Sequence, residues 1–374
     1  MNFIKNHKWL TLFMLLLLVT AGTVVIFLQT PVFGSLPEGQ RLSRIEQSKN
    51  YIEGQFRNQV DTPMFSEGNN FLTVNIRYLF TKTERLAPEE PLPVVKMDLK
   101  NLDRNQDVVI WLGHSGYFIQ LNGKRILVDP VLRPRASPIG FGGKAFPGTT
   151  PYQPEDLPAV DYLLISHDHY DHLDFPTVLE LKEKTGAVIT GLGGGQNFVR
   201  WGYPESKIHE LDWDEFMKTG SGMTFYAIPA RHYSGRALSG NKTLWTGFII
   251  ESPEHRILLS GDSGYGPHYK AIGDRFKSFD LVALDMGQYD PLWPYIHMTP
   301  EEAAKAANDL HTRALLPAHV GRFSLAGHSW DDPFTRISAA SQGQPYKLVT
   351  PIIGEPVLLD NPRQAFSAWW NGLQ

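Results

Sequence analysis

The chain of 374 residues contains no cysteine. This absence excludes disulfides, thiolate nucleophiles and cysteine-ligated zinc, so any metal must be held by His, Asp or Glu. It does not indicate the compartment, because a chain of this length can bury a core without disulfides in either redox environment.

The chain also lacks a dense run of Lys and Arg, and its net charge is −4. Binding to a phosphate backbone requires clustered basic side chains, so we expect no nucleic-acid partner, and a nuclease is disfavoured. Hydrophobic residues make up 42% and charged residues 20%, which is ordinary for a chain that buries a core.

One long apolar run stands near the N-terminus, at residues 9–28, and contains no charged residue. At helical rise its twenty residues cover about 30 Å, the thickness of a bilayer core. Lys5, His7 and Lys8 precede the run, and no charge follows it until Glu38. This flank predicts a cytoplasmic N-terminus and a domain outside the cytoplasm, which is the periplasm in a Gram-negative cell.

Two other interpretations of residues 9–28 remain open. A cleaved signal peptide usually has a shorter apolar core and a small-residue cleavage site, which does not follow cleanly here. A buried core helix would show a polar stripe, and this run shows none. We therefore expect a single-pass, uncleaved membrane anchor.

In the rest of the chain, the pattern of residue types changes at Asp107. Residues 31–106 mix prolines with short helical and irregular patterns, and they show no chemistry of their own; a cap, a membrane linker or a partner surface would fit. Residues 108–132 predict two strands around the turn Asn122-Gly123. Short apolar strands then alternate with fewer helices, one of which begins with a Thr299–Glu302 capping box. This alternation predicts a layered α/β domain.

The strongest motif is His-Asp-His-Tyr-Asp-His at residues 167–172, directly after the apolar strand 162–165. Alternate residues of an extended backbone point the same way, so His167 and His169 can reach one ion together. A turn would bring Asp171 and His172 to a second position nearby. Imidazole nitrogens and carboxylate oxygens suit zinc, manganese or iron.

Two ions need more ligands than this motif supplies. His232, Asp262 and His319 are isolated polar residues, each at the end of an apolar strand. Any one of them alone would more often be structural, but beside the motif we expect them to be ligands. Two ions with four protein contacts each need eight contacts, and seven residues supply these if one carboxylate bridges.

The motif and its flanking segments resemble the metallo-β-lactamase superfamily over residues 108–355. The similarity is closest to the branch of N-acyl-phosphatidylethanolamine-hydrolysing phospholipase D and its bacterial relatives. Besides HDHYDH, it is carried by the segments WLGHS, VDP, ARHYSGR, LLSGDSGY, HMTPEEA and PAHVGRF. The resemblance implies an αββα sandwich with metals at one edge. With the apolar run and the change of pattern at Asp107, we expect three regions: an anchor at 1–30, an extension or cap at 31–106 and a metallo-hydrolase domain at 107–374.

The resemblance also implies the ligands of two divalent metals. The first metal would be held by His167, His169 and His232, the second by Asp171, His172 and His319, and Asp262 would bridge them. Zinc is the metal we expect, with manganese or iron as alternatives. Antibiotic-degrading relatives use a Cys ligand that this chain lacks, which argues against a penicillin-type β-lactamase.

We expect hydrolysis by a hydroxide shared between the metals. Asp171 could also accept a proton. His297, just before a helix N-terminus, could bind a substrate anion or protonate the leaving group, or it could merely cap its own backbone. His114 and Asp129 are interpreted as structural groups or as supports of the ligands. A G-x-S-x-G serine hydrolase is excluded, because Gly113-His114-Ser115-Gly116 does not match that motif.

Three functions fit this reading. The first is a phosphodiesterase acting on a lipid or lipid-like substrate, favoured by the resemblance and by the anchor. The second is a lactone, ester or amide hydrolase on a small molecule, which would use the same metals. The third is a metal-binding envelope protein without turnover. An apolar segment at residues 289–296 could wall a substrate pocket or simply pack in the core.

Overall fold

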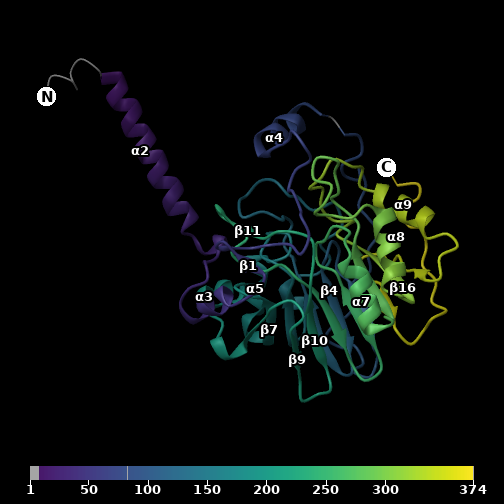
Figure 1. Ribbon diagram of the computed structural model, residues 1–374. Helices are drawn as coiled ribbons and strands as arrows, with labels where there is room; N and C mark the ends of the chain where they lie inside the picture. Colours follow the sequence, from purple (N-terminus) through teal and green to yellow (C-terminus); the bar gives the residue numbers. More distant parts are fainter. Residues whose placement is uncertain (1–7, 82, 374) are drawn as a thin grey trace.

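The computed structural model describes residues 8–81 and 83–373. Its centre is a pair of seven-stranded sheets, each mixed in strand direction (Figure 1). The first sheet, in spatial order, contains β18 (Pro356–Leu358), β3 (Val108–Trp111), β4 (Tyr117–Leu121), β5 (Lys124–Val128), β6 (Val160–Ile165), β7 (Thr185–Gly191) and β8 (Ile208–Leu211). The second contains β17 (Lys347–Leu348), β16 (Ala314–Ala318), β15 (Leu281–Asp285), β14 (Arg256–Leu259), β13 (Gly247–Glu251), β10 (Thr224–Ile228) and β9 (Phe216–Lys218).

Helices cover the outer faces of the two sheets. α5 (Phe175–Leu181) and α6 (Gly195–Arg200) lie beside the first sheet, and α7 (His268–Phe276), α8 (Pro300–Asp309) and α9 (Asp332–Ala340) lie beside the second. The central strands of each sheet are buried on both faces, so their alternating side chains enter different cores. Val109 of β3 packs between the sheets, whereas Val108 packs towards α5 and α6. The expected αββα architecture is confirmed.

Local sequence signals explain several of these elements. Asn122 and Gly123 adopt φ values of 49° and 72°, the left-handed pair that a tight turn between β4 and β5 requires. The prediction of two strands in this segment was incomplete, because a turn at Gly113–Gly116 separates β3 as a third. The Thr299–Glu302 capping box begins α8 as predicted.

The apolar run forms α2 (Lys8–Leu28), which projects away from the sheets and has no buried residue (Figure 1). Its length and composition suit a membrane span, and a signal sequence would share both features. A short joint connects it to the domain, in which the backbone carbonyl of Pro31 accepts a hydrogen bond of 2.8 Å from Trp201 Nε1. The Val32 carbonyl accepts another, of 2.9 Å, from Arg236.

The segment after this joint contains α3 (Gly39–Glu46), the two-stranded β1 (Tyr51–Ile52) and β2 (Gln55–Phe56), and α4 (Phe71–Phe80). Ile45 and Phe56 are buried in a small cluster with Leu192, Trp213 and Trp245, whereas α4 buries only Val74. Asn70 caps α4 through a capping box. The proposed boundaries at residues 30 and 106 stay predictions.

Candidate metal centre

The histidines and aspartates predicted as ligands lie just beyond the carboxyl ends of four strands. The 167–172 run follows β6, and His232, Asp262 and His319 follow β10, β14 and β16. Polar side chains are tolerated at these positions because the strands end there and the loops turn over the edge of the sheets. Strands from both sheets therefore deliver imidazoles and carboxylates to one place.

The side chains form three overlapping groups in which the potential ligand atoms all lie within 4.8 Å of one another. The groups are His167, His169, His232 and Asp262; His114, Asp171, His172 and His319; and Asp262, His297 and His319. All seven predicted ligands belong to them. The structure adds His114, which the sequence had suggested only as a structural or supporting group.

Asp262 lies between the two larger groups. Its Oδ2 atom is 3.7 Å from His167 Nε2 and 3.1 Å from His172 Nε2. Its Oδ1 atom is 3.0 Å from His319 Nδ1, but without the angles of a hydrogen bond. This position matches the bridging role that the resemblance implies.

The buried nitrogen and oxygen atoms are better placed to bind cations than to hydrogen-bond with one another. Asp262 Oδ1 and His172 Nε2 are buried and have no hydrogen-bond partner among the described residues, which is costly for polar atoms. His167 Nε2 and His169 Nδ1 face each other at 2.8 Å. Imidazole nitrogens and carboxylate oxygens converging in this way suit divalent zinc, manganese or iron.

Electrostatics favour the same conclusion. Burial lowers the pKa of His169 to about 4, and it lowers the pKa of His232 and His319 as well, so these rings are neutral and able to ligate. Burial would also lower the pKa of His172, but the carboxylates of Asp262 and Asp171 outweigh it and raise that pKa. The carboxylates thus attract positive charge to this position, and a bound cation would supply that charge in place of the ring proton and leave His172 Nε2 free to ligate.

A buried carboxylate orients His172. Asp129 Oδ1 accepts a hydrogen bond of 2.8 Å from Ser166 N, and its Oδ2 accepts one of 2.9 Å from His172 Nδ1. Because a carboxylate only accepts, the Nδ1 atom of His172 carries the proton and Nε2 presents its lone pair to the centre. Asp129 is therefore placed as a support of a ligand, one of the two roles open from the sequence.

His114 and His232 are fixed in similar ways. Burial lowers the pKa of His114 to about 4, and its Nε2 lies 2.8 Å from Asp171 Oδ2. His232 Nδ1 donates to the backbone carbonyl of Ile296 at 3.0 Å, which leaves Nε2 for a metal. His114 is thus held by a predicted ligand of the centre, whereas the tautomer of His232 is fixed by a backbone carbonyl outside it.

His297 does not cap its own backbone. Its Nδ1 atom lies 2.8 Å from Asp285 Oδ2, and the same oxygen accepts a hydrogen bond of 3.0 Å from Ser263 N. Burial works against protonation of His297, yet Asp285 raises its pKa. Sequence reasoning missed Asp285, although it ends the apolar strand β15 just as the predicted ligands follow theirs.

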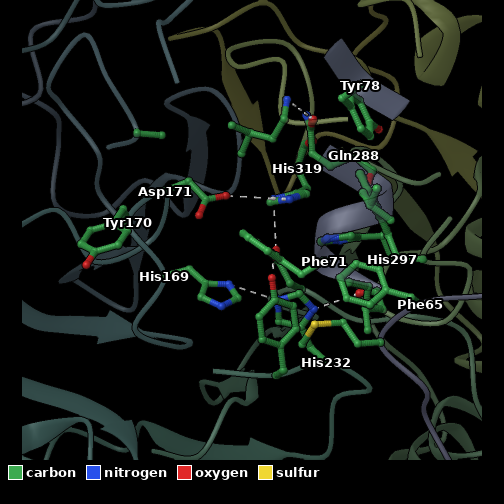
Figure 2. Close-up of a pocket in the computed structure, with 18 of the residues that line it drawn as sticks. Phe65, Phe71, Tyr78, His169, Tyr170, Asp171, His232, Gln288, His297 and His319 are labelled. Carbon is green, nitrogen blue, oxygen red and sulfur yellow. Dashed lines mark hydrogen bonds and ion pairs between the residues drawn. The ribbon is translucent and has the colours of Figure 1, made fainter. Parts of the chain in front are cut away.

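A cavity of about 740 Å³ opens over the centre (Figure 2). Trp293 and Ile296 line it. Part of the 289–296 segment therefore forms a wall of the cavity, which was one of the two interpretations of this segment. Phe65, Phe71 and Tyr78 come from the 31–106 segment, for which the sequence showed no chemistry. Tyr78 Oη donates to Asp290 at 2.6 Å, and its ring stacks on Trp293.

Comparison with known proteins agrees with this geometry. The family described as "Beta-lactamase superfamily domain" matches residues 124–320. An uncharacterised Mycobacterium tuberculosis protein is 37% identical over 329 residues, which cover 87% of this chain and 88% of that protein. N-acyl-phosphatidylethanolamine-hydrolysing phospholipase D 1 of Caenorhabditis elegans is 32% identical over 227 residues, covering 58% of this chain and 64% of its own length.

A solved structure shares the fold. The metallo hydrolase of the archaeon Ignicoccus hospitalis superimposes with a TM-score of 0.53 and 20% identity, and the match covers 67% of this chain and 97% of that one. At this identity the likeness concerns the fold alone.

Proposed function

Because the chain belongs to the beta-lactamase superfamily and has the fold of its metal-dependent hydrolases, we propose that it hydrolyses a phosphodiester of a lipid or lipid-like substrate. The observation that carries this proposal is the convergence of seven His and Asp side chains beneath a cavity with apolar walls. The named function of the Caenorhabditis elegans relative supports the same substrate class.

The proposed centre holds two divalent ions, with zinc favoured over manganese or iron by the nitrogen-rich donor set. His167, His169 and His232 would hold one ion, Asp171, His172 and His319 the other, and Asp262 both. When bound, such ions supply Lewis acidity and lower the pKa of water towards neutrality. The protein contributes the fixed positions and tautomers of its imidazoles and the exclusion of bulk water by the cavity walls.

Two residues are proposed to act on the substrate directly or on its protons. Asp171, held by His114 at 2.8 Å, can accept a proton while it remains oriented towards the centre. His297 borders the cavity, and its protonated form is favoured by Asp285, so it can bind an anionic phosphoryl oxygen or donate a proton to the leaving group.

The substrate class is argued from the cavity and from α2. Phe65, Phe71, Trp293 and Ile296 offer apolar surface beside the donor groups, which suits an acyl or other apolar chain attached to a polar headgroup. We also propose that α2 anchors the chain in a membrane with the catalytic domain outside the cytoplasm, where membrane substrates are concentrated. A lactone, ester or amide hydrolase is the second candidate, because the same donors can polarise a carbonyl.

The test measures metal content and turnover of the full chain on a panel of phosphodiesters, including glycerophospholipids, and on a panel of lactones and esters. The double variant His169→Ala, Asp262→Ala removes one donor of the first proposed ion and the carboxylate proposed to contact both. The double variant His209→Ala, Asp274→Ala is the matched control, since both residues are exposed and distant from the donor groups.

We expect about two metals per chain, phosphodiester turnover in the wild type and the control, and loss of both metal and turnover in the donor variant. Turnover of lactones or esters alone would replace the first candidate by the second. A metal-loaded chain that hydrolyses neither panel would indicate the metal-binding envelope protein without turnover.

A further inference from the structure

Six large apolar side chains outside α2 are far more exposed than the others in the described part of the chain. They are between 66% and 86% exposed, and the next is at 53%. The six are Phe71, Leu72, Leu79, Phe80, Phe141 and Leu238. Scattered exposure of single apolar residues is normal, but so extreme a set needs an explanation if its members lie together.

Five of the six belong to segments that line the cavity over the metal centre, and the sixth lies in a hairpin that contacts a cavity-lining residue. The first four lie on α4, whose Phe71 and Tyr78 line the cavity. Phe141 lies in the loop 133–144, whose Ala136 also lines it. Leu238 is at the tip of the hairpin formed by β11 (Gly235–Arg236) and β12 (Ser239–Gly240). Tyr170, which lines the cavity, meets this tip through a hydrogen bond from Ala237 N.

The hairpin tip also meets the end of α2. Leu28, the last residue of α2, and Leu238 line the same hollow of about 410 Å³. α2, α4 and β11 lie on the upper side of the molecule, whereas β9 lies at its lower edge (Figure 1). If α2 spans a bilayer, the surface of that bilayer passes close to Leu28, and therefore close to Leu238.

The charges around these apolar tips are mostly positive. Within residues 8–81 and 83–373, no carboxylate lies within ion-pair distance of five basic side chains on or beside these segments: Arg77 on α4, Arg135 and Lys144 in the loop 133–144, and Arg200 and Lys242 at the hollow. α4 contains no acidic residue. Two acidic side chains, Glu38 and Asp168, line the hollow together with three basic ones, Arg200, Arg236 and Lys242. Apolar tips flanked by basic residues suit the boundary between acyl chains and anionic headgroups.

We propose that α4, Phe141 and Leu238 form an apolar rim that docks on the lipid bilayer holding α2, so that the cavity opens onto the membrane surface. The rim residues enter the boundary region, and the five cations face lipid phosphates. This proposal rests on the proposed anchoring by α2, but it does not depend on the reaction. It implies that substrate reaches the cavity from the bilayer without first crossing water.

The absence of cysteine makes a direct test possible, because one introduced cysteine is the sole labelling site. Single variants of the full chain, Leu79→Cys, Phe141→Cys and Leu238→Cys, carry a polarity-sensitive fluorophore. Phe216→Cys on β9 is the matched control, since Phe216 is a large apolar residue that is half exposed and remote from the rim. Leu18→Cys within α2 reports the anchor itself.

The labelled chains are reconstituted into vesicles of phosphatidylcholine with phosphatidylglycerol, and quenching by brominated lipids is compared with quenching by aqueous iodide. We expect the three rim labels to shift to the blue, and their quenching by brominated lipid to exceed that at Phe216→Cys severalfold. The Phe216→Cys label should remain open to iodide.

The other outcomes overturn the proposal in distinguishable ways. If Leu18→Cys is quenched by lipid but the rim labels respond like Phe216→Cys, the anchor holds and the docking rim does not exist. If Leu18→Cys is not quenched by lipid, the anchoring itself fails. If the rim labels are shielded from both quenchers, and more so at higher protein density, the rim is an interface between copies of the chain.

Discussion

Replacing Asp129 by asparagine tests how the protein prepares a metal ligand. Asp129 is buried, and it accepts hydrogen bonds from Ser166 N, from Ser166 Oγ and from His172 Nδ1. An asparagine has the same shape but replaces one accepting oxygen by a donating amide. Its remaining oxygen can still accept from Ser166 N, and the Ser166 hydroxyl can rotate to accept from the amide.

His172 has no such freedom. Facing an amide donor, its Nδ1 atom must accept, which moves the ring proton to Nε2, the atom that points to the metal centre. Loss of a partner that orients a ligand typically costs 10–100-fold in metal affinity, which is about 1.4–2.7 kcal/mol. We therefore expect Asp129→Asn to lower the affinity for one of the two proposed metals by about that factor while the fold remains intact.

The assay is metal stoichiometry under graded chelator competition, together with ¹⁵N NMR of the imidazoles, which reports the tautomer of His172. Asp161→Asn is the matched control: Asp161 also joins β5 and β6 by accepting from a backbone amide, that of Arg125 at 2.9 Å, but at the opposite end of β6. If Asp129→Asn retains both metals with the affinity of the wild type and of the control, the orienting role of Asp129 is refuted.

Three further predictions concern pH and packing. Burial, aided by the charge of nearby Arg231, lowers the pKa of His268 from an ordinary 6.5 to about 3. Between these two values the unfolded chain binds a proton that the folded chain does not, so the free energy of unfolding falls as the pH drops. In His268→Gln, denaturation curves at successive pH values should show a weaker dependence of stability on pH. Gly264→Ala would place a Cβ in collision with the backbone carbonyl oxygen of Tyr295, so we expect the free energy of unfolding to fall by about 1–3 kcal/mol and the melting temperature to drop; an unchanged melting temperature would contradict this. Tyr78→Phe removes the bond to Asp290, and we expect about 1 kcal/mol less local protection of α4 in hydrogen exchange, with the sheet amides as internal control.

Much of the centre was accessible from the sequence because its donors obey a local rule. Each predicted ligand is a polar residue just after an apolar strand, and such residues meet at one edge when the strands share sheets. The His-x-His spacing just after β6 predicted two donors at one place, and the structure holds His167 Nε2 and His169 Nδ1 2.8 Å apart. The capping box at Thr299 and the Asn122-Gly123 turn were readable for the same reason, since each is decided within four residues.

The remaining features depend on contacts between distant segments. No sequence pattern near His297 predicts its contact with Asp285, because their hydrogen bond joins a loop to the end of β15. His114 lies in a turn with φ of 57°, a backbone state that the surrounding fold imposes on a non-glycine residue. The role of α4 in walling the cavity rests on Tyr78 meeting Asp290, 212 positions away. Such pairings are set by tertiary packing and cannot be predicted from a local sequence pattern.

The joint between α2 and the domain has a kinetic consequence. Helix and buried core are separated by only a few residues, whose carbonyls are held by Trp201 and Arg236. With α2 in a bilayer, so short a connection would keep the domain at the membrane surface and restrict its motion relative to the bilayer. For the proposed lipid substrate, the search would then be two-dimensional, by lateral diffusion, and turnover should follow the surface density of that lipid in the membrane rather than its bulk concentration.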